Sequence, residues 1–167
     1  MRFSKLLQLA LGTALLAPVL GFAEPAIVYI TRHAEKGTEG KDPDLTVQGQ
    51  ARARMIAGVL QKAGVRHIFS TKTNRTQQTA QPLATKTGVE VQLYEPSKHQ
   101  ALLDKVKTLA GPTLIVGHSN TVPDLVKLFS GKEVPAMPET EYDRLYQLII
   151  EKDGSVTTVL LNSSNGN

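Results

Sequence analysis

Four short predicted strands, each followed by a segment of helical character, constrain the fold of this 167-residue chain more than any other feature. Strands are predicted at residues 27–30, 65–69, 89–93 and 113–116, and the first and last of these are apolar runs typical of buried strands. Helices are predicted over about residues 46–63, 74–87, 97–109 and 122–129. The last two predicted strands, 145–150 and 155–161, meet at Asp153-Gly154, which is a strong hairpin signal. This order predicts an α/β protein, a three-layer α/β/α sandwich with a mostly parallel central sheet and a C-terminal β-hairpin.

The first 23 residues have the pattern of a secretory signal peptide. A basic start with Arg2 and Lys5 precedes a nearly continuous apolar run over residues 6–20, and small residues end the segment at Ala23. We therefore expect cleavage after Ala23, a single domain over residues 24–167, and a periplasmic or secreted protein. The alternative is an uncleaved membrane anchor, but the apolar run is shorter than the roughly 20 residues that a spanning helix needs, and it contains Pro18. No stable membrane insertion is expected after cleavage.

Charge and composition exclude several classes of function. The net charge is +4, and it falls to +2 without the two basic residues of the leader, which is too little to indicate a nucleic-acid partner. The absence of cysteine excludes disulfides, thiolate metal sites and cysteine nucleophiles. No two of the four histidines are spaced as neighbours on one helix face, and no acidic cluster accompanies them. We therefore predict neither a metal site nor another cofactor.

Three polar loops each begin directly after a predicted strand. The first contains Arg32-His33, the second covers residues 70–75 and ends in Arg75, and the third is His118-Ser119-Asn120. Hydroxyls of residues 70–73 are suited to capping the helix that follows them. Because parallel strands place their carboxyl ends along one edge of a sheet, we expect the three loops to converge. Arginine forks bind phosphoryl oxygens in pairs, so this set predicts a pocket for a dianionic phosphoryl group.

These residues belong to four motifs that occur in a fixed order. They are Thr31-Arg32-His33-Ala34-Glu35-Lys36, Leu45-Thr46-x-x-Gly49, Ser70-x-x-x-x-Arg75-x-x-Gln78-Thr79-Ala80 and Gly117-His118-Ser119. Together they make the chain resemble the histidine phosphatase superfamily, in the branch that contains phosphoglycerate mutases and small phosphohistidine phosphatases. The resemblance runs from about residue 27 to residue 161, which is nearly all of the predicted domain.

The resemblance implies a covalent mechanism and a role for each matching residue. It makes His33 the nucleophile that forms a phosphohistidine, which water then hydrolyses. It assigns Arg32, Arg75 and His118 to the phosphoryl oxygens, and Asn120 is a further candidate donor. The two arginines are expected to keep His33 neutral by disfavouring its imidazolium form. The implied activity is that of a histidine acid phosphatase-type phosphoric monoester hydrolase without a metal.

The general acid that protonates the leaving group is the least determined role. In this branch it is usually an acidic residue between the second arginine and the second histidine, an interval that holds Glu90, Glu95 and Asp104. Glu95 fits best because it follows the third predicted strand at its carboxyl end. Glu35 is the reserve candidate, and some small members that cleave phosphohistidine have no clear acid.

The substrate is expected to be a phosphorylated small molecule, or a phosphorylated glycan or protein, selected by the loops at residues 37–44 and 131–141. A phosphohistidine-protein phosphatase and a non-catalytic phosphate-binding module remain alternatives, although a binding module would tolerate loss of the His33 nucleophile. A mutase is disfavoured because mutases of this family are longer and carry insertions that enclose the substrate.

Overall fold

The computed structural model describes residues 26–163, so the predicted signal peptide lies outside the described residues. Strands and helices alternate along most of the chain. In chain order they are β1 Ala26–Arg32, α1 Val47–Leu60, β2 His67–Ser70, α2 Asn74–Thr87, β3 Val91–Leu93, α3 His99–Lys107, β4 Thr113–Gly117, α4 Val122–Ser130, β5 Arg144–Ile150 and β6 Val156–Asn162. Within this part of the chain, no helix has the length and apolar character that crossing a membrane would require.

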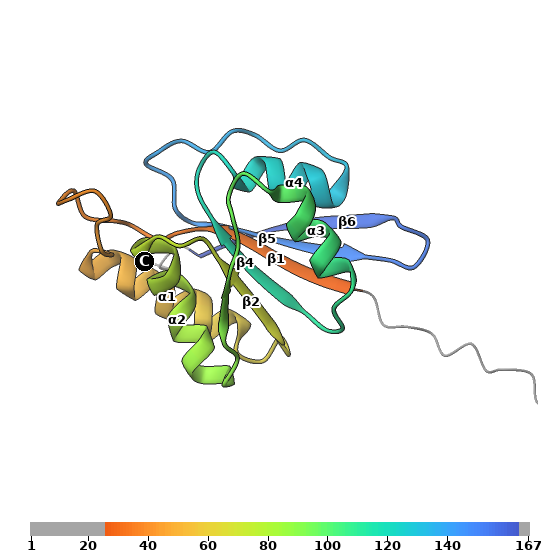
Figure 1. Cartoon of the computed structure of the whole chain (residues 1–167), viewed down its shortest axis with the longest axis horizontal. Coiled ribbons are helices and arrows are strands. Elements are labelled where there is room, and N and C mark those ends of the chain that lie inside the picture. The colour runs from red at the N-terminus through yellow and green to blue at the C-terminus, as the bar shows by residue number, and fades with distance from the viewer. Residues whose placement is uncertain (1–25, 164–167) are drawn as a thin grey trace, which may run out of the picture.

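The six strands form one sheet in the order β3-β2-β4-β1-β5-β6. The strands β3, β2, β4 and β1 run parallel to one another, whereas β5 pairs antiparallel with β1 and β6 pairs antiparallel with β5. Helices α1 and α2 lie on one side of the sheet, and α3 and α4 lie on the other (Figure 1). The predicted three-layer α/β/α sandwich with a C-terminal hairpin is confirmed.

Strand β1 is central and is buried on both faces. Val28 and Ile30 belong to the apolar cluster that includes residues of α3 and α4, whereas Tyr29 belongs to the cluster formed with α1 and α2. A strand covered by helices on both sides reads as a continuous apolar run, which explains the pattern of this segment. Strand β1 ends at Arg32, and the next two residues, His33 and Ala34, are still buried.

The two helices on the first face begin in different ways. The Thr46 hydroxyl accepts a hydrogen bond from the Gly49 backbone N–H at 3.0 Å and caps α1. Thr73 precedes α2 but makes no side-chain cap, so the expected hydroxyl cap of α2 is wrong. The Asp42 carboxylate accepts from the Asn74 backbone N–H instead, at 3.0 and 3.1 Å. Asp42 of the loop at residues 37–44 thus supplies the cap of α2 that residues 70–73 were expected to supply.

Gly49 allows α1 to pack closely against the segment that follows the Arg32-His33 loop. A Cβ at this position would lie 2.1 Å from the backbone oxygen of Glu35. We expect Gly49→Ala to lower the free energy of unfolding by about 3 kcal/mol, because neither backbone can move without disturbing the core. Gly58→Ala is the matched control, since Gly58 is exposed in the same helix with no atom in the way, and it should stabilise by about 0.5–1 kcal/mol. Urea denaturation measures both values, and equal effects would contradict the close packing.

Candidate active site

The carboxyl ends of the parallel strands bring the three polar loops together. Arg32 is opposite Gly117 in the β1–β4 pair, and Ser70 is opposite Val116 in the β2–β4 pair. A pocket of about 360 Å³ opens at this edge. Its lining consists of His33, Lys36, Arg75, Pro96, His118, Ser119, Asn120, Thr121 and Glu139. The structure thus brings together four of the predicted site residues, His33, Arg75, His118 and Asn120.

His33 is held in one orientation directly after β1. Its backbone N–H donates to the Gly117 carbonyl at 2.9 Å, and the residue is only 3% exposed. Its ring Nδ1 lies 2.8 Å from the Ala34 carbonyl oxygen. Because a carbonyl only accepts, Nδ1 carries the hydrogen of the neutral ring, and Nε2 carries the lone pair. The neutral ring therefore keeps the Nε2 lone pair of His33 free of a hydrogen.

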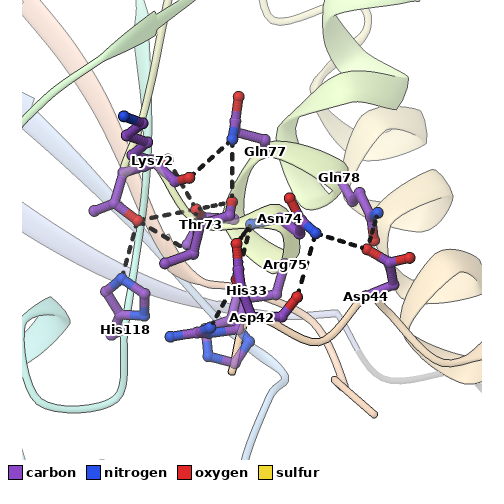
Figure 2. A network of polar contacts seen from close by, with 12 residues as sticks. His33, Asp42, Asp44, Lys72, Thr73, Asn74, Arg75, Gln77, Gln78 and His118 are labelled. Carbon is purple, nitrogen blue, oxygen red and sulfur yellow. Dashed lines mark hydrogen bonds and ion pairs between the residues drawn. The ribbon is translucent and has the colours of Figure 1, made fainter. Parts of the chain in front are cut away.

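His118 is anchored by hydroxyl groups from the loop after β2. Its ring lies 5.5 Å from the His33 ring between centroids, and its Nε2 lies 2.9 Å from Thr71 Oγ1. Thr71 Oγ1 in turn lies 2.9 Å from Thr76 Oγ1, at the start of α2. Figure 2 shows this polar network extending from His118 toward α2. Because Thr71 takes Nε2, Nδ1 is the ring nitrogen of His118 that remains for a ligand.

Arg75 reaches the pocket from the first turn of α2. Its Nη1 lies 3.3 Å from Asp42 Oδ1, and its side chain is 19% exposed. Its Nε is buried and makes no hydrogen bond within residues 26–163. Figure 2 shows Arg75 with Asp42 beside His33. Arg75 therefore lies where an oxyanion entering the pocket would meet its charge, and its role as a phosphoryl ligand stays a prediction.

Arg32 is more tightly engaged than the sequence suggested. Its side chain is fully buried, and Nη1 donates to the carbonyls of Pro138, Glu139 and Glu141 at 2.9 to 3.0 Å. Nη2 donates to Glu139 Oε2 at 2.6 Å, and the guanidinium lies 4.2 Å from the centroid of the Tyr142 ring. The loop after α4 thus covers Arg32, which does not line the pocket in this conformation.

Neither predicted general acid fits this geometry. Glu95 is exposed and lies outside the pocket lining, where its neighbour Pro96 takes part instead. Glu35 is largely buried in an ion pair, with Arg52 Nη2 at 2.6 Å and Arg52 Nε at 2.9 and 3.0 Å from its two oxygens. Glu35 therefore joins α1 to the Arg32-His33 loop and has no part in the pocket.

Sequence reasoning missed Glu139 as a member of the site. Its carboxylate contacts Arg32 through Oε2 and accepts a short hydrogen bond from the Ser119 hydroxyl through Oε1. The Ser119 hydrogen bond is the main cause that holds the Glu139 pKa below its ordinary value, and Arg32 contributes in the same direction. No local motif marks Glu139. The only signal in the sequence was Arg32 at the end of the buried strand β1, because a buried arginine needs a carboxylate partner from elsewhere in the chain.

Both histidines are neutral at ordinary pH. Burial lowers the pKa of His33 to about 3, with smaller contributions from Arg32, His118 and Arg75 in the same direction and an opposing one from the Ala34 hydrogen bond. Burial also lowers the pKa of His118 to about 4, and Arg75 is the largest charged contributor. Burial thus does more than the arginines to keep His33 in the form that can attack phosphorus.

These lowered pKa values predict that acid destabilises the protein. Below pH 6.5 both histidines become protonated in the unfolded chain but stay neutral in the folded chain. The free energy of unfolding is therefore highest above pH 6.5 and decreases as the pH falls toward the folded-state pKa values. We expect His33→Asn to reduce the loss of unfolding free energy between pH 6.5 and 4.5 by about 2–3 kcal/mol. Urea denaturation of both proteins at pH 7.5, 6.5 and 4.5 measures this difference. Parallel pH profiles would contradict a neutral, buried His33.

The described side chains do not form a cluster of metal ligands. Within residues 26–163, no three histidine, aspartate or glutamate side chains lie close enough together to hold a metal ion. The charges available to a ligand in the pocket are those of Arg75, Lys36 and Glu139.

Comparisons with known proteins agree with this fold and arrangement. A family model for the histidine phosphatase superfamily, branch 1, matches residues 28–96. Probable phosphoglycerate mutase GpmB of Serratia proteamaculans (strain 568) is 35% identical over 71 residues, which are 38% of this chain. The match covers 33% of that protein, so the chain spans about a third of the length of the curated relatives it matches.

Solved structures resemble almost the entire described chain. The protein histidine phosphatase SixA, in complex with tungstate, superposes with a TM-score of 0.69 at 18% identity and covers 82% of this chain and 97% of its own. A putative alpha-ribazole-5'-P phosphatase from Escherichia coli gives a TM-score of 0.68 at 14% identity, over 85% of this chain and all of its own. The family model over residues 28–96 and the curated relatives support the histidine phosphatase superfamily, branch 1, and the solved structures show the shared fold.

Proposed function

We propose that the chain is a phosphatase that hydrolyses phosphomonoesters through a phosphohistidine on His33. One observation carries the proposal: the His33 ring is buried and neutral, its Nδ1–H is committed to the Ala34 carbonyl, and it lines a pocket together with Arg75 and His118. A neutral imidazole with a free Nε2 is a nucleophile, and the charge of Arg75 in the pocket attracts the phosphoryl group that Nε2 attacks.

The reaction then follows in two steps. Nε2 of His33 attacks phosphorus as the bond to the leaving oxygen breaks, and that oxygen departs with a proton. Arg75 and Nδ1 of His118 contact the phosphoryl oxygens and stabilise the charge that develops on them. Water next attacks the phosphohistidine, the P–N bond breaks, and inorganic phosphate leaves with His33 neutral again.

We propose that this chemistry is metal-independent, because side-chain cations supply the charge that a metal would otherwise bring. The substrate class is a phosphorylated small molecule, glycan or protein. The names of the structural neighbours support this class, since one is a protein histidine phosphatase and another a putative phosphatase of a small phosphate ester. Residues 1–23 further support export to the periplasm, and mass spectrometry of the purified protein should then find Glu24 at its N-terminus.

Turnover of p-nitrophenyl phosphate by the protein, with and without EDTA, tests the proposal. We expect equal release of p-nitrophenol in both conditions. Activity that EDTA removes would contradict metal independence. Binding of tungstate without turnover of any phosphomonoester would support the alternative of a phosphate-binding module, and isomerisation of a phosphoglycerate without phosphate release would indicate a mutase.

A further inference from the structure

We propose that Glu139 is the general acid of the reaction, and that the substrate's phosphoryl group brings it into that role by displacing its carboxylate from Arg32. The inference rests on the proposed phosphatase function and adds to it the source of the leaving-group proton. It replaces Glu95 and Glu35, which the geometry does not support as acids.

The hydrogen bonds of Arg32 show which side of its guanidinium is open to exchange. Nη1 is occupied by three backbone carbonyls of the loop after α4. On the opposite edge, Nη2 contacts only the Glu139 carboxylate, and Nε makes no hydrogen bond within residues 26–163. Nη2 and Nε together form the fork that binds two oxygens of a phosphoryl group. The Glu139 carboxylate therefore occupies one of the two positions on this edge that a phosphoryl group would take.

The contacts of Glu139 favour such an exchange. Its side chain is 75% exposed, so water solvates the carboxylate as soon as it leaves Arg32. Its other oxygen accepts from the Ser119 hydroxyl, in the loop that also carries His118. Because this second hydrogen bond does not involve Arg32, the carboxyl group remains at the pocket after displacement. Because Glu139 and His33 line the same pocket, the displaced carboxyl group lies beside the phosphoryl group that His33 attacks.

Displacement also changes the protonation of Glu139. In the free protein, the groups that face Glu139 are the Ser119 hydroxyl, Arg32 and the rings of His33 and His118. The Ser119 hydrogen bond lowers its pKa most, and Arg32 and His33 act in the same direction. Lys36 and Arg75 line the same pocket. A bound dianion takes Arg32 away from Glu139 and places negative charge next to it, and both changes raise its pKa. Substrate binding thus draws a proton to Glu139.

The proton balances the two chemical steps. In the first step, Nε2 of His33 bonds to phosphorus, the bond between phosphorus and the ester oxygen breaks, and that oxygen takes the Glu139 proton and leaves as an alcohol. In the second step, a water oxygen bonds to phosphorus, one water proton returns to Glu139, and the P–N electron pair returns to His33.

Two other carboxylates near the pocket, those of Glu35 and Asp42, are committed to structural contacts. Glu35 is paired with Arg52 inside the protein. Asp42 accepts from the backbone N–H of Asn74 and contacts Arg75, but it does not line the pocket. Among the carboxylates that the structure describes, Glu139 is the one in the lining.

Leaving-group dependence separates an acid from a residue that only positions Arg32. Glu139→Gln should lower kcat for an alkyl phosphate, glycerol 2-phosphate, by about 10²–10³-fold, because an alkoxide needs a proton to leave. It should lower kcat for p-nitrophenyl phosphate by less than about fivefold, because p-nitrophenolate leaves without one. Glu133→Gln is the matched control, since Glu133 lies in the same loop, pairs with Lys127 and does not line the pocket. It should leave both rates unchanged.

Three results would overturn the proposal: equal losses on both substrates in Glu139→Gln, the selective loss appearing in Glu95→Gln instead, or a wild-type protein that hydrolyses only the nitrophenyl ester. In each of these cases, turnover of p-nitrophenyl phosphate by the wild type would still support the proposed phosphatase function. Failure of the wild type on every phosphomonoester would refute the phosphatase function and, with it, an acid role for Glu139.

Proton uptake supplies a second readout, independent of turnover. Tungstate binding is measured by calorimetry at pH 6 in two buffers of different ionisation enthalpy, which gives the number of protons taken up. We expect the wild type to take up more protons than Glu139→Gln. Equal uptake by both proteins would overturn the exchange at Arg32.

Discussion

Replacing His33 with alanine should lower kcat/KM for p-nitrophenyl phosphate by at least about 10⁴-fold. The reason is that, in the proposed mechanism, the Nε2 lone pair of His33 forms the covalent bond to phosphorus, and no neighbouring group in the pocket is placed to take over that attack. His118 lies close, but its Nε2 contacts Thr71 Oγ1, and its Nδ1 is assigned to the phosphoryl oxygens in the proposed mechanism. The rates are measured under identical conditions with the same protein concentration.

The alanine variant also needs a check that it is folded and keeps its pocket. Tungstate should still bind to it, because Arg75 and His118 remain in place, and its circular dichroism spectrum should match that of the wild type. His67→Ala is the matched control, since His67 starts β2 at the opposite edge of the sheet and contacts the Ala110 carbonyl. Its activity should be unchanged. A His33→Ala variant within tenfold of wild-type activity would exclude His33 as the nucleophile.

Replacing Arg75 with alanine should lower kcat/KM by about 10²–10³-fold, the typical loss when one donor to a developing oxyanion is removed. Arg75→Lys should recover part of the loss, because an ammonium keeps the charge without the paired donors of the guanidinium. Arg54→Ala is the control, since Arg54 is exposed on α1 away from the pocket. Tungstate affinity, measured by calorimetry, should fall in the same order as the rates.

The charge of Arg75 adds a second effect to that variant. Arg75 lowers the pKa of both His33 and His118, so its removal should raise both values. The acid limb of the pH–rate profile should therefore move to higher pH in Arg75→Ala. A loss of activity without loss of tungstate affinity, or one that Arg54→Ala shares, would contradict the role of Arg75 as a phosphoryl ligand.

The fold was predictable because its signals are local. Four predicted strands followed by helical segments, together with Asp153-Gly154, were enough to predict the sheet and the hairpin. The predicted bounds of α2 agree with the structure, since Gly88 ends the helix in a left-handed conformation. The start of α3 was less predictable: a helix was expected from about residue 97, but α3 begins at His99 without a side-chain cap.

Site residues that directly follow strands could be predicted from the sequence. Site residues that irregular loops bring to the pocket could not. His33 and His118 follow adjacent parallel strands, so the order of the sheet brings them together. Glu139 is separated from Arg32 by more than a hundred residues and reaches it through an irregular loop, for which no periodicity or motif gives a signal. Glu35 likewise looked free in the sequence, but its partner Arg52 comes from the following helix.

The most direct test of the mechanism is to trap the covalent intermediate. The protein is mixed with excess p-nitrophenyl phosphate, stopped within milliseconds in alkaline detergent, digested, and analysed by mass spectrometry for a phosphorylated peptide. We expect one phosphoryl group on His33, stable to alkali, lost in acid, and absent from His33→Ala. A phosphoryl group on a serine or threonine would contradict the mechanism. So would full turnover with no trapped intermediate and a product made by direct attack of water, seen as inversion at a chiral phosphorus.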